Sequence, residues 1–173
     1  MEKVLRRVEK GLAVFSLDEV QLTPTKDYKL LARLNETVQT LHRQRYPEVF
    51  QEYSYQAVEK VFKKFLKSKG WQALAVTYQD EVLGYALFCE RQVGDNPFRK
   101  GYRSLHLEQL SFLPAYQRRG LGHLVMKHLE KLALQKGFSQ LELSYWEQNV
   151  EAGEFYKKQG FTTAYRFMVK PLP

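Results

Sequence analysis

The chain has 173 residues, a mass of 20.4 kDa and a formal net charge of +8, from 27 Lys and Arg against 19 Asp and Glu. This length and a 44% content of apolar residues are typical of one globular domain over residues 1–173 and exclude a disordered chain. No apolar run approaches the roughly 18 residues of a transmembrane helix, so no association with a membrane is expected. The single cysteine, Cys89, excludes an intrachain disulfide and a cysteine-rich metal site.

The first 17 residues superficially resemble a signal peptide, because basic residues precede a short apolar stretch. The stretch has the minimum length, is followed by Asp18-Glu19 and lacks a small-x-small cleavage site. We therefore expect a cytoplasmic protein in which residues 1–17 are a structural extension. A short amphipathic helix over Glu2–Lys10 is a further expectation for this segment.

Apolar periodicity and turn residues predict strands and helices in the order β-α-α-β-β-β-α-β-α-β. The strands are expected at 20–23, 72–78, 82–91, 104–113, 141–145 and 161–169, and the helices from Asp27 to Pro47 and at 55–69, 121–136 and 150–159. Three antiparallel strands thus precede a β-α-β crossover. This order predicts an α/β sandwich around a mixed sheet and not a regular Rossmann alternation.

Alternation along the strand at 104–113 predicts which side chains share a face. One face is expected to hold Leu105 and Leu107, with Gln109 breaking the series, and the other His106, Glu108, Leu110 and Phe112.

A basic, glycine-containing loop, Gln117 to Gly122, joins this strand to the next helix. The N–H groups at a helix start have no intrahelical partners, and the helix dipole is positive there. Glycines let the backbone approach an anion closely, and Arg118 and Arg119 add positive charge. The loop is neither a dinucleotide fingerprint, because residue 125 is Val, nor a Walker A loop. Its spacing alone fits a pyrophosphate site as well as a tight turn with two solvated arginines.

Two segments resemble signatures of the GCN5-related N-acetyltransferase (GNAT) family. Gln117-Arg118-Arg119-Gly120-Leu121-Gly122 has the pattern Gln/Arg-x-x-Gly-x-Gly/Ala, and residues 149–161 resemble Asn-x-x-Ala-x-x-Phe-Tyr-x-x-x-Gly-Phe. The order of elements also fits, from about Val20 onwards. The resemblance implies a mostly antiparallel sheet flanked by helices, with a V-shaped splay between its two central strands.

The resemblance further implies transfer of an acetyl group from acetyl-CoA to an amine. The loop, including Arg118, Arg119, Gly120 and Leu121, would hold the CoA pyrophosphate, mainly through its backbone. The main chain at Leu110 and Phe112 would pair with the pantetheine arm, and a bulge in that strand would offer N–H groups to the thioester carbonyl. Asn149 would contact the cofactor arm, and Tyr156 would return a proton to the leaving thiolate.

An amine with a pKa near 10.4 is almost entirely protonated at pH 7, so the reaction needs a base. His106 and Glu108 are the candidates, two residues apart on one strand and therefore on one face. The alternatives are a carboxylate satisfied by a neighbouring strand for Glu108, a polar residue on a half-exposed sheet for His106, and a core tyrosine for Tyr156. The other histidines lack metal-ligand spacing, so no metal is expected.

The acceptor is not written in the sequence, although the family shapes its pocket with the first two helices and the loop at 92–103. The basic residues of that loop, Arg99, Lys100 and Arg103, argue against a polycationic acceptor and for one with a negative part. Two other functions stay open: CoA binding without catalysis, and acetylation of an amine linked to tRNA or the ribosome, which the lysines of 58–69 suggest. Nucleic acid is otherwise not an expected partner, and the last strand is a candidate surface for a homodimer.

Overall fold

The computed structural model describes residues 16–172, so the expected helix at Glu2–Lys10 lies outside the described residues. One five-stranded sheet has the order β1-β2-β3-β4-β5, and its neighbours are antiparallel except for the parallel pair β4 and β5. The strands are β1 (Gln21–Pro24), β2 (Trp71–Tyr78), β3 (Glu81–Val93), β4 (Tyr102–Phe112) and β5 (Gln140–Leu143).

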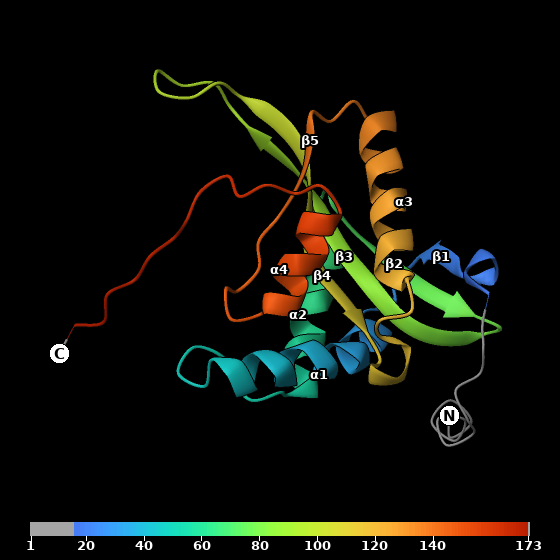
Figure 1. Ribbon diagram of the computed structural model, residues 1–173. Coiled ribbons are helices and arrows are strands. Elements are labelled where there is room, and N and C mark those ends of the chain that lie inside the picture. The colour runs from blue at the N-terminus through green and yellow to red at the C-terminus, as the bar shows by residue number, and fades with distance from the viewer. Residues whose placement is uncertain (1–15, 173) are drawn as a thin grey trace.

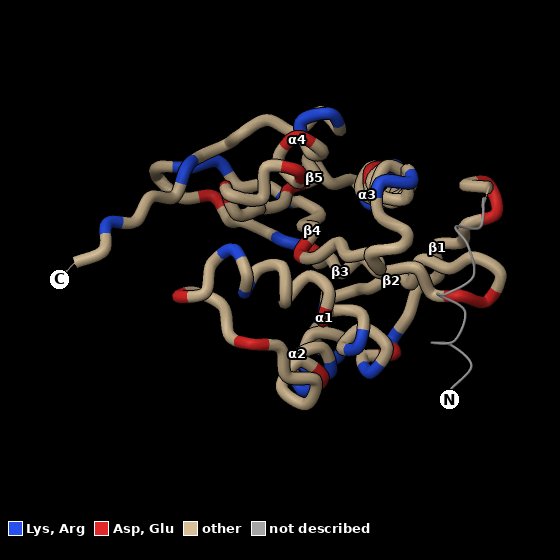
Figure 2. Tube along the Cα trace, turned by 60° about the horizontal axis from the view of Figure 1, so that its bottom comes forward, with Lys and Arg blue, Asp and Glu red and all other residues tan. Residues whose placement is uncertain are grey.

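Four helices cover the two faces of the sheet, and Figure 2 shows the resulting three layers. They are α1 (Tyr28–Arg45), α2 (Tyr55–Lys67), α3 (Leu121–Gln135) and α4 (Val150–Lys158). One core lies between the sheet and α3 with α4, and a second lies between the sheet and α1 with α2. The mixed α/β architecture is confirmed, and the predicted helix ends differ from the structure by two residues or fewer. No helix within residues 16–172 is long and apolar enough to cross a membrane.

The predicted start of α1 shows how local sequence fixes an element. The Oδ1 atom of Asp27 accepts a hydrogen bond from the Leu30 N–H at 2.9 Å, which satisfies one free donor of the first turn. Leu31 and Leu34 then point into the second core. This helix thereby lies against the sheet on the face opposite α3.

A bulge interrupts β4 at Glu108. Leu87 of β3 lies opposite Gln109 and Phe88 lies opposite Leu107, so Glu108 is the extra residue. An extra residue shifts the alternation of side chains by one. Leu110 and Phe112 therefore pack on the α3 and α4 face, together with Leu107. The prediction that Leu110 and Phe112 share a face with His106 is wrong for this reason.

The strands β4 and β5 separate just beyond the bulge. β5 pairs only with Ser104–Leu107, whereas β4 continues through Glu108–Phe112 with β3 as its neighbour on one side. The expected splay is present, but within residues 16–172 it lies between β4 and the edge strand β5 and not between two central strands. Within the described residues, the backbone of Glu108–Phe112 has no strand beside it on the β5 side.

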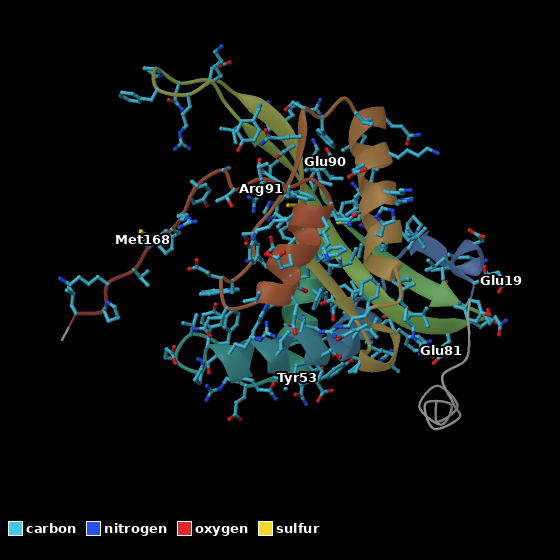
Figure 3. The ribbon with its side chains drawn as sticks, in the orientation of Figure 1. Glu19, Tyr53, Glu81, Glu90, Arg91 and Met168 are labelled. Carbon is cyan, nitrogen blue, oxygen red and sulfur yellow. The ribbon has the colours of Figure 1, made fainter. Side chains whose placement is uncertain are left out.

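The segment after α4 differs from the prediction. Residues 161–169 form no strand, and the chain leaves the body as an extended tail (Figures 1 and 3). Tyr165, Phe167 and Met168 are 80%, 85% and 86% exposed. The sequence has the propensity for a strand, but a strand also needs a neighbour to pair with, and the tail has none in the described chain.

Candidate active site

The loop Gln117–Gly122 turns sharply between the end of β4 and the start of α3. Arg118 and Gly120 both have left-handed backbones, with φ of +59° and +84°. The side-chain amide of Gln117 donates to the carbonyl oxygen of Phe112 at 3.0 Å, which ties the loop to the end of β4. Gly120 is the N-cap of α3 and offers no side-chain acceptor, so the first N–H groups of that helix suit an anion.

The loop is also held against α4. A Cβ atom at Gly122 would lie 2.8 Å from Cζ of Phe155, so a side chain at this position would have to displace the Phe155 ring. The exposed guanidinium of Arg118 lies 3.5 Å from Glu151 of α4, and Arg119 lies over the ring of Tyr116. The two signature segments identified in the sequence are therefore in contact.

Asn149 caps α4 and is also bound to α1. Its Oδ1 atom accepts from the Ala152 N–H at 3.3 Å and from Arg45 at 2.6 Å. Arg45 pairs in addition with Glu151 at 2.7 Å. Because the protein itself uses the side-chain oxygen of Asn149, a contact with a cofactor falls to its amide nitrogen.

Tyr156 packs among aromatic rings on the α3 and α4 side, against Tyr145, Phe155 and Phe161. Burial raises the pKa of its phenol to about 12. The group therefore stays protonated throughout the neutral range, which suits a proton donor. The same packing fits the alternative of a core tyrosine.

Four ionisable side chains, which we call the charged cluster, meet on the opposite face of the sheet. They are Arg91 of β3, His106 and Glu108 of β4, and Glu142 of β5; Figure 3 labels Arg91. His106 lies between the two carboxylates, with Nε2 3.4 Å from Glu108 and Nδ1 3.7 Å from Glu142.

His106 is only 4% exposed, so the expectation of a polar residue on a half-exposed sheet is wrong. A hydrogen bond from His106 lowers the pKa of the Glu108 carboxyl below its usual range, against the effect of desolvation. Glu108 is therefore ionised near neutral pH and is itself exposed to solvent. Its pairing with Arg91 at 4.0 Å also matches the alternative of a satisfied carboxylate.

Sequence reasoning missed Glu142. Its position between Leu141 and Leu143 is visible in the sequence, but its place beside His106 depends on the parallel register of β4 and β5. In the described part of the chain, no group of three or more His, Cys, Asp or Glu residues is arranged to hold a metal ion.

A second, uncharged group, which we call the neutral cluster, adjoins the bulge. Asn35 of α1 donates to the Tyr85 hydroxyl at 3.0 Å, and that hydroxyl donates to Oε1 of Gln109 at 2.7 Å. The sequence signal for it was Asn35, a polar residue inside the apolar stripe of its helix. Since the bulge puts Glu108 and Gln109 on one face, the charged and neutral clusters are neighbours.

A pocket of about 260 Å³ opens between α1 and α2 and reaches Gln109. Its walls are Val58, Val61, Phe62 and Phe65 of α2, and we call it the α1–α2 pocket. The site thus has two approaches: the free edge of β4 with the basic loop on one side of the sheet, and this pocket on the other.

Comparison with known proteins agrees with this arrangement. Residues 35–161 match the model of the Acetyltransferase (GNAT) family. A stretch of 58 residues is 36% identical to thialysine N-epsilon-acetyltransferase of Bos taurus and 34% identical to that of Mus musculus. This stretch covers 34% of the chain and 34% of each of these relatives, so the chain matches about a third of their length.

Solved structures of low sequence identity share the fold. A tetramutant of the BH1408 protein from Bacillus halodurans superposes with a TM-score of 0.80 at 18% identity, over 88% of this chain and 99% of that one. An aminoglycoside N-acetyltransferase, AAC(6')-Iy in complex with CoA, gives a TM-score of 0.64 at 14% identity, over 88% and 94%. With the family match over residues 35–161 and both signature segments in contact, the chain belongs to the GNAT acetyltransferase family.

Proposed function

We propose that the protein transfers an acetyl group from acetyl-CoA to a primary amine of a small molecule or a protein, by direct attack in a ternary complex. The observation that carries this proposal is the free edge of β4. Within the described residues, the backbone of Glu108–Phe112 has no paired strand where β5 diverges, and it leads directly to the loop Gln117–Gly122. An extended amide-bearing chain pairs with such an edge as an added strand does, and its pyrophosphate then meets the helix start.

The two faces of β4 divide the chemistry. On the α1 and α2 face, Glu108 accepts the proton of the acceptor ammonium, directly or through water, and His106 keeps this carboxylate ionised. The bulge exposes N–H groups to the oxyanion that forms as the C–N bond is made. On the α3 and α4 face, Tyr156 gives its proton to the sulfur as the C–S bond breaks, and the second proton of the attacking nitrogen passes through water to the tyrosinate, which restores the phenol.

The comparisons support an amine acceptor, since the named relatives are N-acetyltransferases. Cys89 is buried as a free thiol, and burial raises its pKa, which fits a protein of a reducing compartment. We place the protein in the cytoplasm as part of the same proposal.

The test is calorimetric titration with acetyl-CoA, with ATP and NADH as controls, followed by thiol release in the presence of amines. We expect selective binding of acetyl-CoA at micromolar affinity. Tyr156→Phe and Glu108→Gln should keep that affinity and lower kcat at least 10-fold. The control is Glu90→Gln, a carboxylate on the adjacent strand that pairs with Lys136.

Each failure has its own meaning. Absence of acetyl-CoA binding by folded protein would refute the proposal. Binding with thiol release that neither substitution changes would refute the roles of Tyr156 and Glu108. Binding without thiol release for any amine would leave a CoA-binding module instead of an enzyme.

A further inference from the structure

The α1–α2 pocket has an apolar wall and an uncharged inner end. Val58, Val61, Phe62 and Phe65 belong to successive turns of α2 and form the wall. On the side of the sheet the pocket is lined by Gln109 of β4, which we call its inner end and whose Oε1 atom is held by the Tyr85 hydroxyl. Its remaining lining residues are Asn35, Gln39, Gln51, Glu52, Ser54 and Ala57.

Among the described lining residues, the α1–α2 pocket has one acidic side chain and no basic one. Glu52 is the one ionisable group among the lining residues, and it is exposed to solvent. No Lys, Arg or His lines the pocket, so a carboxylate on the acceptor would meet no counter-ion there. A second ammonium group would lie against apolar side chains with only the exposed carboxylate of Glu52 to pair with, and an ion pair at such an exposed place contributes little.

The bulge fixes the direction in which an amine would lie. Gln109 ends the pocket, and the next residue back along the chain is Glu108, on the same face. The reacting nitrogen therefore belongs at the inner end, beside the carboxylate, and the rest of the acceptor extends along α2. A volume of about 260 Å³ is below the usual range for drug-sized ligands, so the body must be small.

From this lining we infer that the acceptor is a small primary monoamine with an apolar body, alkyl or aralkyl, and not a polyamine or a free amino acid. The inference rests on the proposed function and names the substrate class of that same site. It also separates this chain from the curated relatives, whose name gives thialysine, an amino acid, as the acceptor.

Chain length is the direct probe. At saturating acetyl-CoA, kcat/KM is measured for n-propylamine, n-butylamine, n-pentylamine and n-hexylamine. These amines have nearly equal pKa values, so their neutral fractions match and only buried length changes. Each methylene buried against the wall should raise kcat/KM about fourfold, until the pocket is full.

Charge is the second probe, with n-pentylamine as the reference. Both 1,5-diaminopentane and 5-aminopentanoate have the same chain length and carry one further charge. Each should react with a kcat/KM at least 10-fold lower than that of n-pentylamine. Equal or better turnover of either compound would overturn the inference.

A variant that fills the pocket allows a test whose readout, a ratio of two kcat/KM values, does not depend on the stability of the protein. Ala57 is exposed and lines the pocket, so Ala57→Phe adds a ring without disturbing a core. It should lower the ratio of the kcat/KM values for n-hexylamine and n-propylamine at least 10-fold. The ratio does not depend on how much protein is folded. The matched control is Ala164→Phe on the exposed tail, which should leave the ratio unchanged.

The outcomes separate this inference from the proposed function. If acetyl-CoA binds and amines are acetylated without a rise along the alkyl series, the acceptor class is wrong and the enzyme stands. If acetyl-CoA binds and none of these monoamines reacts, the acceptor class is again wrong. If acetyl-CoA does not bind, the proposed function has failed, and the inference falls with it.

Discussion

The neutral cluster allows a direct test of how Gln109, at the inner end of the α1–α2 pocket, is held in place. Tyr85→Phe removes one hydroxyl that accepts from Asn35 at 3.0 Å and donates to Gln109 at 2.7 Å. A buried hydrogen bond contributes about 1 kcal/mol net, so the two together contribute about 2 kcal/mol. The contact between Asn35 and Gln109 at 3.3 Å remains, so neither amide is left without a partner and the cost should not rise far above that figure.

Tyr53→Phe is the matched control, and Figure 3 labels this residue. The Tyr53 hydroxyl donates one hydrogen bond, to the Ala32 carbonyl at 2.9 Å, in a partly buried place. Its loss should cost about 1 kcal/mol or less, because water can replace the donor.

The assay is urea unfolding at pH 7, read as the shift in midpoint at constant m. In thermal unfolding, Tyr85→Phe should lower Tm by about 4–8 °C, about twice the shift of the control. The reasoning is refuted if the two substitutions cost the same, or if Tyr85→Phe stabilises the protein. The same variant should also raise KM for the amine more than KM for acetyl-CoA, since only the inner end of the pocket is loosened.

Three further predictions address the cofactor side and the titrating groups. Gly122→Val should weaken acetyl-CoA binding at least 10-fold in calorimetry, because its branched side chain would force Phe155 and the start of α3 apart; Phe155→Leu in the same chain should restore part of the affinity. The raised pKa of Tyr156 means that the folded state keeps a proton that the unfolded state loses above about pH 10, so the free energy of unfolding falls as the pH rises. Between pH 10 and pH 11, the free energy of unfolding of Tyr156→Phe, measured in urea, should therefore fall by about 1 kcal/mol less than that of the wild type. Because the pKa of Glu108 is lowered, this carboxylate is ionised from pH 6 upward and takes its proton from the bound ammonium, so kcat/KM should stay nearly constant from pH 6 to pH 9; a steady rise with the neutral fraction of the free amine would contradict this role of Glu108.

Local patterns in the sequence were enough to predict the helices and the turn between β4 and α3. The Asp27 cap, the glycines of the loop and the Asn149 cap each act within a few residues of their own position, so their effect is readable without the fold. The basic loop and the segment beginning at Asn149 come together because α3 and β5 connect them in a β-α-β crossover, whose topology is restricted.

The acceptor side could not be predicted in the same way. The position of Glu142 beside His106 depends on strand register, and the role of Asn35 depends on how α1 crosses the sheet. Both are set by packing between segments far apart in sequence. The prediction of a strand at 161–169 was wrong for a related reason. Propensity describes the segment alone, whereas a strand must pair with the edge of a second strand.

The single extra residue in β4 determines whether odd-numbered or even-numbered side chains of that strand face α3. Before the bulge, odd-numbered positions such as Leu107 face α3, and after it, even-numbered positions such as Leu110 do so. Deleting Glu108 would remove more than a carboxylate, because all side chains on one side of the deletion would then point to the opposite face of the sheet. Either the core leucines or Gln109 would then meet the wrong helices. The charged cluster and the neutral cluster are therefore linked through one position, because Glu108, the base that we propose, is also the residue that shifts the alternation of β4.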